Sequence, residues 1–598
     1  MRNKLLLIGA AVAAFAIPAI GQEIARPAPA PQPQPIAPAQ VAPTPGGEPV
    51  PAQSSEPATS GSSPRSGGEG GNIGIADLSA VELPEPPPPV ELPDHARRDP
   101  RVVGRLDPVG IGIGANPWGG ANGRFLSLLL RRLDTPLASR WVHIALRNAL
   151  LARAGAPFGV QPVDWVGERA WLLLRMGEAD AARMLVSGVD VDRFTPKMFQ
   201  IAVQTALANG DPPGLCPLQD GIRRHERGIG PLVDAMCASL AGEPESAAAQ
   251  IDSARRRGRI GGIDLILAQK VVGAGANTSR AVTVEWEPVD RLNSWRFGLA
   301  TATGVVPPER LLTASSPQVR AWQARAPMLS AQQRLQSARI ATGLGVFSSQ
   351  ALLDLYSTLY DATDPDELSE SDAWQLRLAF TGRDLRARLD AMRKLWKNDR
   401  DSIDREASRA LLARAASLVA PSADVEADAA NLIASMLAGG YDREAARWAS
   451  VTGGMEAKNA DACWAMLALA APNGVAIDVS AGRVQSFIGR DTSARKQRSA
   501  LLVAGLAGLG RLSAEDADSL NRRHGLALEH RTRWTQMIDA TAARGQAGST
   551  LILAGTGFQS TSLDRLPSSH LFHAVAALRR TGQNFTARMV AAEALSRT

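Results

Sequence analysis

The stretch Trp171-Leu-Leu-Leu-Arg-Met-Gly-Glu-Ala-Asp-Ala-Ala182 decides the fold class, because it places a sharp stop between two helical segments. Its apolar half is helix-like and stops at Gly177, and five residues later Ala182 falls inside the next helix. A sharp stop favours a residue that tolerates positive φ just past the helix end, and glycine does so without a steric penalty. The returning helix must pack closely on the first, so its contact position favours a small side chain.

The same five-residue step from glycine to alanine recurs further along the chain. The further pairs are Gly242 with Ala247, Gly440 with Ala445, and Gly582 with Ala587. Residues 571–578 before the last pair place apolar side chains at the i, i+3, i+4, i+7 spacing of a helix. The sequence therefore predicts an all-α chain built from helical hairpins.

This pattern resembles the tetratricopeptide class of helical repeats, in which Gly-x-x-x-x-Ala marks the turn between paired helices. The resemblance implies an α-solenoid of stacked hairpins, whose long concave surface usually binds protein or polymer. An alanine-rich helical bundle with ordinary glycine stops is the alternative. We expect two helical-repeat arrays, residues 105–280 and 281–598, with an extended linker rather than a strand at Val282–Trp286.

Helix starts are marked by capping residues at several places. Ser330-Ala-Gln-Gln333 has the spacing of a capping box. Thr195-Pro196 and Ser316-Pro317 each place an N-cap residue before a proline in the first turn. These patterns predict helices that begin at residues 196, 317 and 331.

Residues 1–21 have the three parts of a Sec-type signal peptide. A short basic region ends at Lys4, an apolar run covers Leu5–Ile20, and small residues stand at the −3 and −1 positions before Gln22. The run is broken by Pro18 and is shorter than the about 20 residues that span a membrane, so cleavage is favoured over an uncleaved anchor. We expect a periplasmic or secreted protein with no transmembrane span in the mature chain.

Residues 22–104 differ in composition from the rest of the chain. Eighteen of the 40 prolines lie between Pro27 and Pro93, and serine and glycine are frequent in residues 54–71. Such a stretch cannot bury enough apolar surface to offset its ordering entropy, so we expect a disordered tether with polyproline II character. A recognition peptide for a proline-binding partner is the alternative.

The three cysteines predict one disulfide and one free thiol, because an odd number in an exported chain leaves one unpaired. Cys216 and Cys237 fall on two consecutive predicted helices. Antiparallel neighbours at this spacing bring the two Cα atoms within the roughly 4.4–6.8 Å that a disulfide needs. We therefore favour a Cys216–Cys237 disulfide over two buried thiols, and we expect Cys463 to be buried and unreactive.

No pattern assembles a catalytic, cofactor or metal site. Ser493-Ala-Arg-Lys496 matches the S-x-x-K of penicillin-recognising enzymes but lacks their Lys-Thr-Gly element. Glu245 and Glu370 each precede a serine, as the acid of soluble lytic transglycosylases does, but no lysozyme-like domain surrounds them, so we interpret both as capping residues. Four histidines, interpreted as packed or surface residues, are His524, His530, His570 and His573.

A glycine-rich segment precedes the first predicted helix. Gly110-Ile-Gly-Ile-Gly114, followed by Asn116-Pro-Trp-Gly-Gly120, lacks the G-x-G-x-x-G spacing and the βαβ context of a nucleotide loop. We interpret it as the entry to the folded region, with Trp118 packed as a cap.

Charge and architecture together favour a binding function. The chain has 65 basic and 59 acidic residues and no long basic run, which argues against nucleic acid as a partner. We expect an exported, non-catalytic scaffold or adaptor, without a cofactor, that binds an envelope protein or an anionic polysaccharide such as peptidoglycan. The alternatives are an enzyme of cell-wall or glycan turnover with a superhelical domain, as in lytic transglycosylases, and a purely structural envelope protein.

The signal-peptide prediction fixes the first residue of the mature protein. N-terminal sequencing of the protein from a cell that exports it is expected to start at Gln22, because the small residues at −3 and −1 define that cleavage site. Recovery of residues 1–21 from the membrane fraction would instead indicate an uncleaved anchor.

Overall fold

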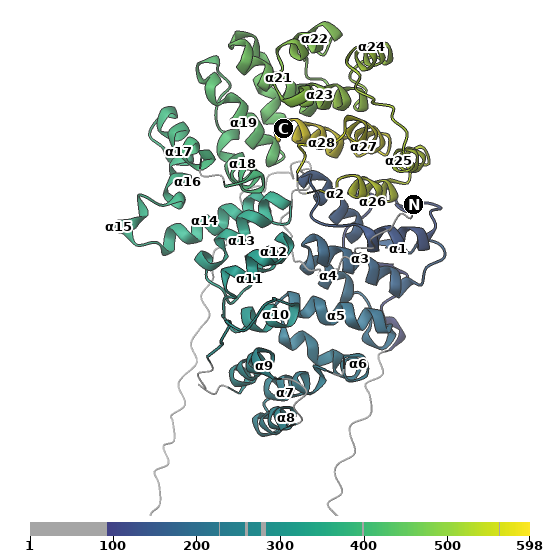
Figure 1. Ribbon diagram of the computed structural model, residues 1–598, viewed down its shortest axis with the longest axis vertical. Helices are drawn as coiled ribbons and strands as arrows, with labels where there is room; N and C mark the ends of the chain where they lie inside the picture. The colour runs from purple at the N-terminus through teal and green to yellow at the C-terminus, as the bar shows by residue number, and fades with distance from the viewer. Residues whose placement is uncertain (1–92, 227, 257–260, 277–282, 398–399, 561) are drawn as a thin grey trace, which may run out of the picture. The chain divides into compact units, whose positions relative to one another are not determined.

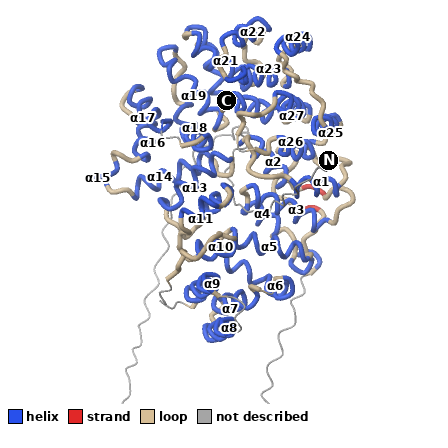
Figure 2. Tube along the Cα trace, viewed as in Figure 1, coloured by secondary structure: helices blue, strands red, loops and turns tan. Residues whose placement is uncertain are grey.

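Helices make up nearly all of the regular structure (Figure 1, Figure 2). The computed structural model describes residues 93–226, 228–256, 261–276, 283–397, 400–560 and 562–598. The predicted signal peptide and most of the predicted tether lie outside these residues. Within them there are 28 α-helices, and the only strands are the antiparallel two-residue pair β1 (Val102–Val103) and β2 (Ala154–Gly155). The all-α prediction is confirmed.

From α2 to α9 each helix packs on the next, and α1 packs on α3. The short 3₁₀ helix η3 (Pro212–Leu218) separates α5 from α6. The bounds are α1 (Gly123–Arg132), α2 (Arg140–Leu151), α3 (Pro162–Met176), α4 (Ala179–Val186), α5 (Pro196–Ala208), α6 (Gln219–His225), α7 (Gly230–Leu240), α8 (Pro244–Arg256) and α9 (Gly262–Gly275).

The middle helices continue this neighbour-to-neighbour packing, with α12 on α13, α16 on α17 and α18 on α19. The chain from 283 to 286 forms no strand, in agreement with a linker at this place. The bounds are α10 (Ser294–Ala302), α11 (Glu309–Ala314), α12 (Pro317–Arg325), α13 (Ala331–Leu344), α14 (Ser349–Ala362), α15 (Pro365–Leu368), α16 (Asp372–Thr381), α17 (Leu385–Lys397), α18 (Ser402–Ser417), α19 (Glu426–Ala438) and α20 (Asp442–Ala446).

The remaining helices return to the beginning of the folded region, because α26 and α28 both pack on α2 (Figure 1). Segments more than 400 residues apart in sequence thus lie side by side. The bounds are α21 (Ala457–Ala470), α22 (Ala481–Arg490), α23 (Gln497–Gly508), α24 (Ala514–His524), α25 (Arg533–Ala543), α26 (Ala547–Gly557), α27 (Ser568–Arg580) and α28 (Asn584–Ser596).

The predicted glycine turns share one backbone geometry. All four glycines have positive φ, with 116° at Gly177, 85° at Gly242, 81° at Gly440 and 82° at Gly582. In each turn the N–H of the residue after glycine donates to the carbonyl five positions earlier, as from Glu178 to Leu173 at 2.7 Å, which is the bonding of a Schellman motif. The alanine five positions after each of these glycines has no exposed surface; the four are Ala182, Ala247, Ala445 and Ala587.

A fifth turn of the same kind joins α25 to α26. Gly545 has φ of 67°, and the N–H of Gln546 donates to the carbonyl of Thr541 at 3.1 Å. The residue five positions after this glycine is Thr550, which is fully buried. The sequence pattern missed this turn because a threonine, rather than an alanine, occupies the contact position.

Helix α2 is the meeting point of several of these elements, and its first residue, Arg140, is 1% exposed. The Arg140 guanidinium donates to the carbonyls of Thr342 in α13, at 3.0 Å, and Ala438 in α19, at 2.6 Å. These carbonyls belong to the last turns of their helices, where the regular i+4 donor is missing, although that of Thr342 also accepts from the N–H of Gly345 at 3.0 Å. Arg140 therefore ties α2 to the ends of two helices far along the chain.

The N-terminus of α2 is capped by a carboxylate from α28. Glu593 accepts hydrogen bonds from the hydroxyl of Ser139 at 2.5 Å and from the backbone N–H groups of Arg140 at 2.8 Å and Trp141 at 3.3 Å. A negative charge at this end of a helix is favoured by the helix dipole. Arg597 also pairs with Glu593, at 2.7 Å, so the buried carboxylate is neutralised.

A second buried arginine holds the other end of α2. Arg169 in α3 donates to the carbonyls of Leu150, Ala152 and Val103, at 3.1, 3.0 and 2.7 Å. Burial lowers the pKa of Arg169 to about 9, because none of these partners is a carboxylate that would favour the charged form.

The hydrophobic side chains form two cores. The larger extends through most helices, and the second is made by residues between Ala202 and Leu311. Members of the second core stand on both sides of residue 281, such as Val271 and Trp295. The residues from Arg98 to Thr598 form one compact unit. The division into arrays 105–280 and 281–598 stays a prediction.

Two of the three predicted helix starts carry the expected cap. The Thr195 hydroxyl accepts from the N–H of Met198 at 3.2 Å, and Ser330 forms a full capping box with Gln333. Ser316 precedes α12 as predicted, but its side chain makes no capping hydrogen bond.

Alanine substitutions at two of the turn glycines separate the energetic cost of a positive φ from the cost of a steric clash. A Cβ on Gly177 would lie 2.4 Å from Cγ2 of Val346, whereas a Cβ on Gly242 would meet nothing within 4 Å. We expect Gly242→Ala to lower the free energy of unfolding by about 1 kcal/mol through φ alone, and Gly177→Ala by about 2–4 kcal/mol through φ and overpacking. Urea unfolding followed by circular dichroism measures both, and equal losses would contradict a role for Val346.

Candidate functional site

The turn residues selected by the sequence lie in the scaffold rather than on a binding surface. Gly177 packs on Val346, and a Cβ on Gly440 would lie 3.3 Å from the ring of Trp141. The alanines of the signature are buried in helix–helix contacts. These residues position helices, and a ligand site has to be sought elsewhere.

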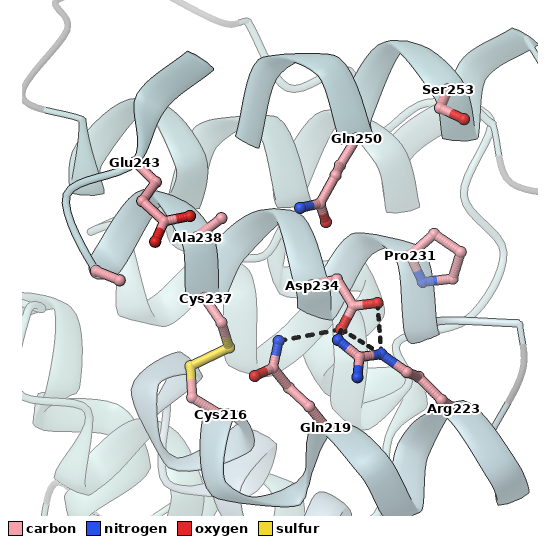
Figure 3. Close-up of a pocket in the computed structure, with 11 residues that line it drawn as sticks. Cys216, Gln219, Arg223, Pro231, Asp234, Cys237, Ala238, Glu243, Gln250 and Ser253 are labelled. Atoms are coloured by element: carbon pink, nitrogen blue, oxygen red, sulfur yellow. Dashed lines mark hydrogen bonds and ion pairs between the residues drawn. A yellow bond between two sulfur atoms is a disulfide. The ribbon is translucent and has the colours of Figure 1, made fainter. Parts of the chain in front are cut away.

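The cysteine prediction is confirmed: Cys216 and Cys237 form a disulfide with a Cα–Cα distance of 5.6 Å (Figure 3). Cys237 lies on α7, as expected. Cys216 lies in the 3₁₀ helix η3 rather than in an α-helix. The reason is local, since Pro217 has no N–H to donate and this short segment is rich in proline.

A pocket of about 640 Å³ lies beside the disulfide (Figure 3). Its main charged groups are already paired: Asp234 accepts from Arg223 Nε at 3.0 and 3.1 Å and from Gln219 Nε2 at 3.0 Å. The hydrogen bond to Asp234 raises the pKa of Arg223 above its ordinary value. The ion pair and the disulfide both cross-link α7 to the segment before it, so this pocket serves the local fold.

The third cysteine is buried as predicted. Cys463 has no exposed surface and lies next to Trp464 in α21. Burial raises the pKa of the Cys463 thiol to about 12, and the charge of Glu426 acts in the same direction. A thiol of this kind stays protonated at neutral pH and is a poor nucleophile.

The candidate catalytic residues do not assemble into a site. The Ser493 hydroxyl accepts from the N–H of Arg498 at 3.1 Å, whereas Lys496 Nζ donates to the carbonyl of Ile488 at 2.5 Å, so the two are not a Ser–Lys pair. Glu245 and Glu370 are both exposed, away from the apolar surroundings that a general acid needs.

The histidines are held in separate contacts. His573 Nδ1 lies 2.9 Å from a carboxylate oxygen of Asp539, and the ring of His570 lies 4.6 Å from that of Trp534. Burial lowers the pKa of His570. His524 Nε2 lies 3.0 Å from the side-chain oxygen of Gln485. No cluster of three or more potential ligand residues of the kind that binds a metal ion occurs in the described part of the chain.

The second pocket is a groove of about 840 Å³ that α1 and the loop before it form with α25 and α26. One face of α25 supplies six of its lining residues. Their spacing of i, i+3, i+4, i+7, i+8, i+11 is that of a single stripe along a helix. These residues are Arg533, Gln536, Met537, Ala540, Thr541 and Arg544.

The opposite wall of the groove comes from the N-terminal side of the chain. Phe125 and Leu126 of α1 line it, and Phe125 is 39% exposed. The glycine-rich segment also contributes, through Gly119 and Gly120. This wall combines apolar residues with the polar Asn122, and the stripe of α25 likewise mixes polar and apolar side chains.

The glycine-rich loop is fixed on the N-terminus of α26. The carbonyl of Pro117 accepts from the N–H groups of Gly548 at 2.8 Å and Ser549 at 3.3 Å. Trp118 is 1% exposed and packs edge-to-face on Trp165 at 5.1 Å, as the cap interpretation expects. A Cβ on Gly119 would lie 2.7 Å from the side chain of Gln546, so only glycine fits here.

Both ends of the α25 stripe carry a cation without a protein partner. The guanidinium groups of Arg533 and Arg544 make no hydrogen bond or ion pair with any described residue. No acidic side chain is among the described residues that line the groove. Sequence reasoning missed this site, because the stripe lies on an ordinary amphipathic helix and its opposite wall is about 400 residues away.

No family model, curated protein or solved structure matches the chain. Among the helices of the described residues, none combines the length and apolar character required to cross a bilayer.

Thiol titration tests the cysteine assignments together. In the native, non-reduced protein we expect no reaction with Ellman's reagent, because two cysteines are bonded and Cys463 is buried and protonated. One thiol should react in denaturant, and three after reduction. Two extra reactive thiols in denaturant without reductant would contradict the disulfide. Replacing both Cys216 and Cys237 by serine should cost about 3 kcal/mol of stability in the chain-entropy model.

Proposed function

We propose that this protein is an exported, non-catalytic helical-repeat adaptor that holds an extended segment of an envelope partner in the groove between α1 and α25. The observation that carries the proposal is the pair of arginines without protein partners at the two ends of one groove-facing stripe. A cation without a partner beside exposed apolar surface is typical of a binding site rather than of a structural contact.

The helical-repeat part of the proposal has its support in the turns. Five hairpins combine the left-handed glycine and the Schellman bonding with a buried alanine or threonine in the second helix. The glycine and the bonding also occur at Gly210, Gly304, Gly345 and Gly510. Repeated units with one turn geometry are typical of tetratricopeptide-like arrays. We propose on this basis that the chain is an α-solenoid related in architecture to that class.

Export is supported by the sequence of residues 1–21 and by the disulfide. Disulfides persist in oxidising compartments such as the periplasm and are rare in the cytosol. A proline-rich tether ahead of the folded region would give it reach from an attachment point. It belongs to the proposal, since residues 1–92 lie outside those that the structure describes, and at the end of the expected range 22–104 Val102 and Val103 form strand β1 of the folded region.

Site-specific photo-crosslinking in intact cells tests the proposed function. A photoreactive amino acid at Gln536, in the middle of the stripe, is expected to give a discrete adduct with an envelope partner. The same amino acid at Arg522, an exposed position on α24, is the matched control and should give none. The double variant Arg533→Glu, Arg544→Glu should reduce the Gln536 adduct at least about tenfold, because like charge then repels an anionic partner.

Two different results would contradict the proposed function. Equal adducts at Gln536 and Arg522, or an adduct that survives the charge reversal, would show that the groove is not the binding site. Release of soluble fragments from purified cell walls by the isolated protein would instead support an enzyme of cell-wall turnover.

A further inference from the structure

The two arginines at the ends of the α25 stripe define the distance between two anionic groups of a ligand that pairs with both. Arg533 and Arg544 are separated by 11 residues, which is about three turns and about 16 Å of helix rise, and both face the groove. An extended peptide advances about 3.3 Å per residue. Two carboxylates about five residues apart in such a peptide therefore match the two guanidinium groups.

The position of Arg533 points to an anion from outside the helix. It is the first residue of α25, where the positive end of the helix dipole disfavours a cation, and the first turn has no acidic residue to offset this. A carboxylate bound at this end would interact favourably with both the guanidinium and the helix terminus. Nothing within the described fold supplies that carboxylate.

The middle of the groove carries both polar and apolar side chains, among them Gln536 and Met537 of α25. The ring of Phe125 is half-exposed at the opposite edge, whereas Leu126 and Leu553 are each 1% exposed and offer a ligand almost no surface. Burying an apolar side chain of a ligand against Met537 and Phe125 is favourable. The ligand therefore has apolar character between its two anionic groups.

This division of polar and apolar surface distinguishes a peptide from a polysaccharide. A polyuronate chain carries hydroxyl groups along its whole length, and those that face Met537 and Phe125 would find no hydrogen-bond partner there. A peptide with an apolar side chain between two acidic ones meets both parts of the groove.

We infer that the groove between α1 and α25 recognises an extended acidic peptide of a partner protein, with carboxylates about five residues apart and an apolar residue between them. This inference rests on the proposed function and specifies its ligand. Arg533 and Arg544 bind the two carboxylates, and Met537 and Phe125 contact the apolar side chain.

Fluorescence anisotropy with the mature full-length protein tests the inference. The probe is a labelled hexapeptide with aspartate at both ends and leucine in the middle. We expect binding that weakens with added salt, because exposed charge pairs are screened. Arg533→Gln and Arg544→Gln should each raise the Kd about tenfold, and the double variant about a hundredfold, since distant sites act additively.

Matched controls isolate each part of the argument. Arg531→Gln removes the same charge from an exposed residue two positions before the stripe and should change the Kd less than about twofold. Placing the two aspartates next to each other, or replacing the leucine by serine, should weaken binding at least about fivefold.

Three outcomes would overturn the inference, and one of them spares the proposed function. If a hexameric uronate binds with the same dependence on Arg533 and Arg544 while the peptide does not, the ligand is a polysaccharide and the groove remains the site. If Arg531→Gln weakens binding as much as the stripe variants do, the peptide binds to the general positive charge of this surface and not to the two groove arginines. If neither probe binds, the groove does not hold an anionic chain at all.

Discussion

The contact between Arg140, Glu593 and the ends of two distant helices is the constraint on which the rest of the structure depends. Arg140 at the start of α2 reaches the final carbonyls of α13 and α19, while Glu593 of α28 caps the same helix. A guanidinium suits this role because its planar fork donates to several acceptors at once and stays charged when buried. All but seven of the 65 basic residues are arginines, and Arg169 and Arg175 serve helix ends in the same way.

This arrangement explains how the groove acquires two walls from opposite parts of the chain. Because α26 and α28 pack on α2, the helices that follow residue 533 are brought beside α1 and the loop around Pro117. The stripe on α25 then faces a surface that is fixed by buried tryptophans and by backbone hydrogen bonds. The candidate site is therefore rigid on both sides, which lowers the entropic cost of ordering it when a ligand binds.

Local features of the fold were predictable from the sequence, and long-range ones were not. Glycine at 177, 242, 440 and 582 predicts a helix stop because a positive φ is needed there, and the capping box at Ser330 is equally local. The disulfide follows from spacing within one hairpin. The turn at Gly545 escaped the pattern because Thr550 fills the contact position. The groove escaped because no periodicity within α25 indicates that Phe125 lies opposite.

The bond between Ser139 and Glu593 has a consequence for the order in which the chain acquires its structure. The two residues are separated by 454 positions, so at ~5–20 residues per second a ribosome delivers the acceptor roughly 20–90 s after the donor. Throughout that interval α2 has its Ser139 cap but lacks the Glu593 carboxylate, which does not yet exist. Contacts of such separation also slow folding after synthesis. A nascent chain of this protein stays unfinished, and hence open to chaperones, until nearly all of it has been made.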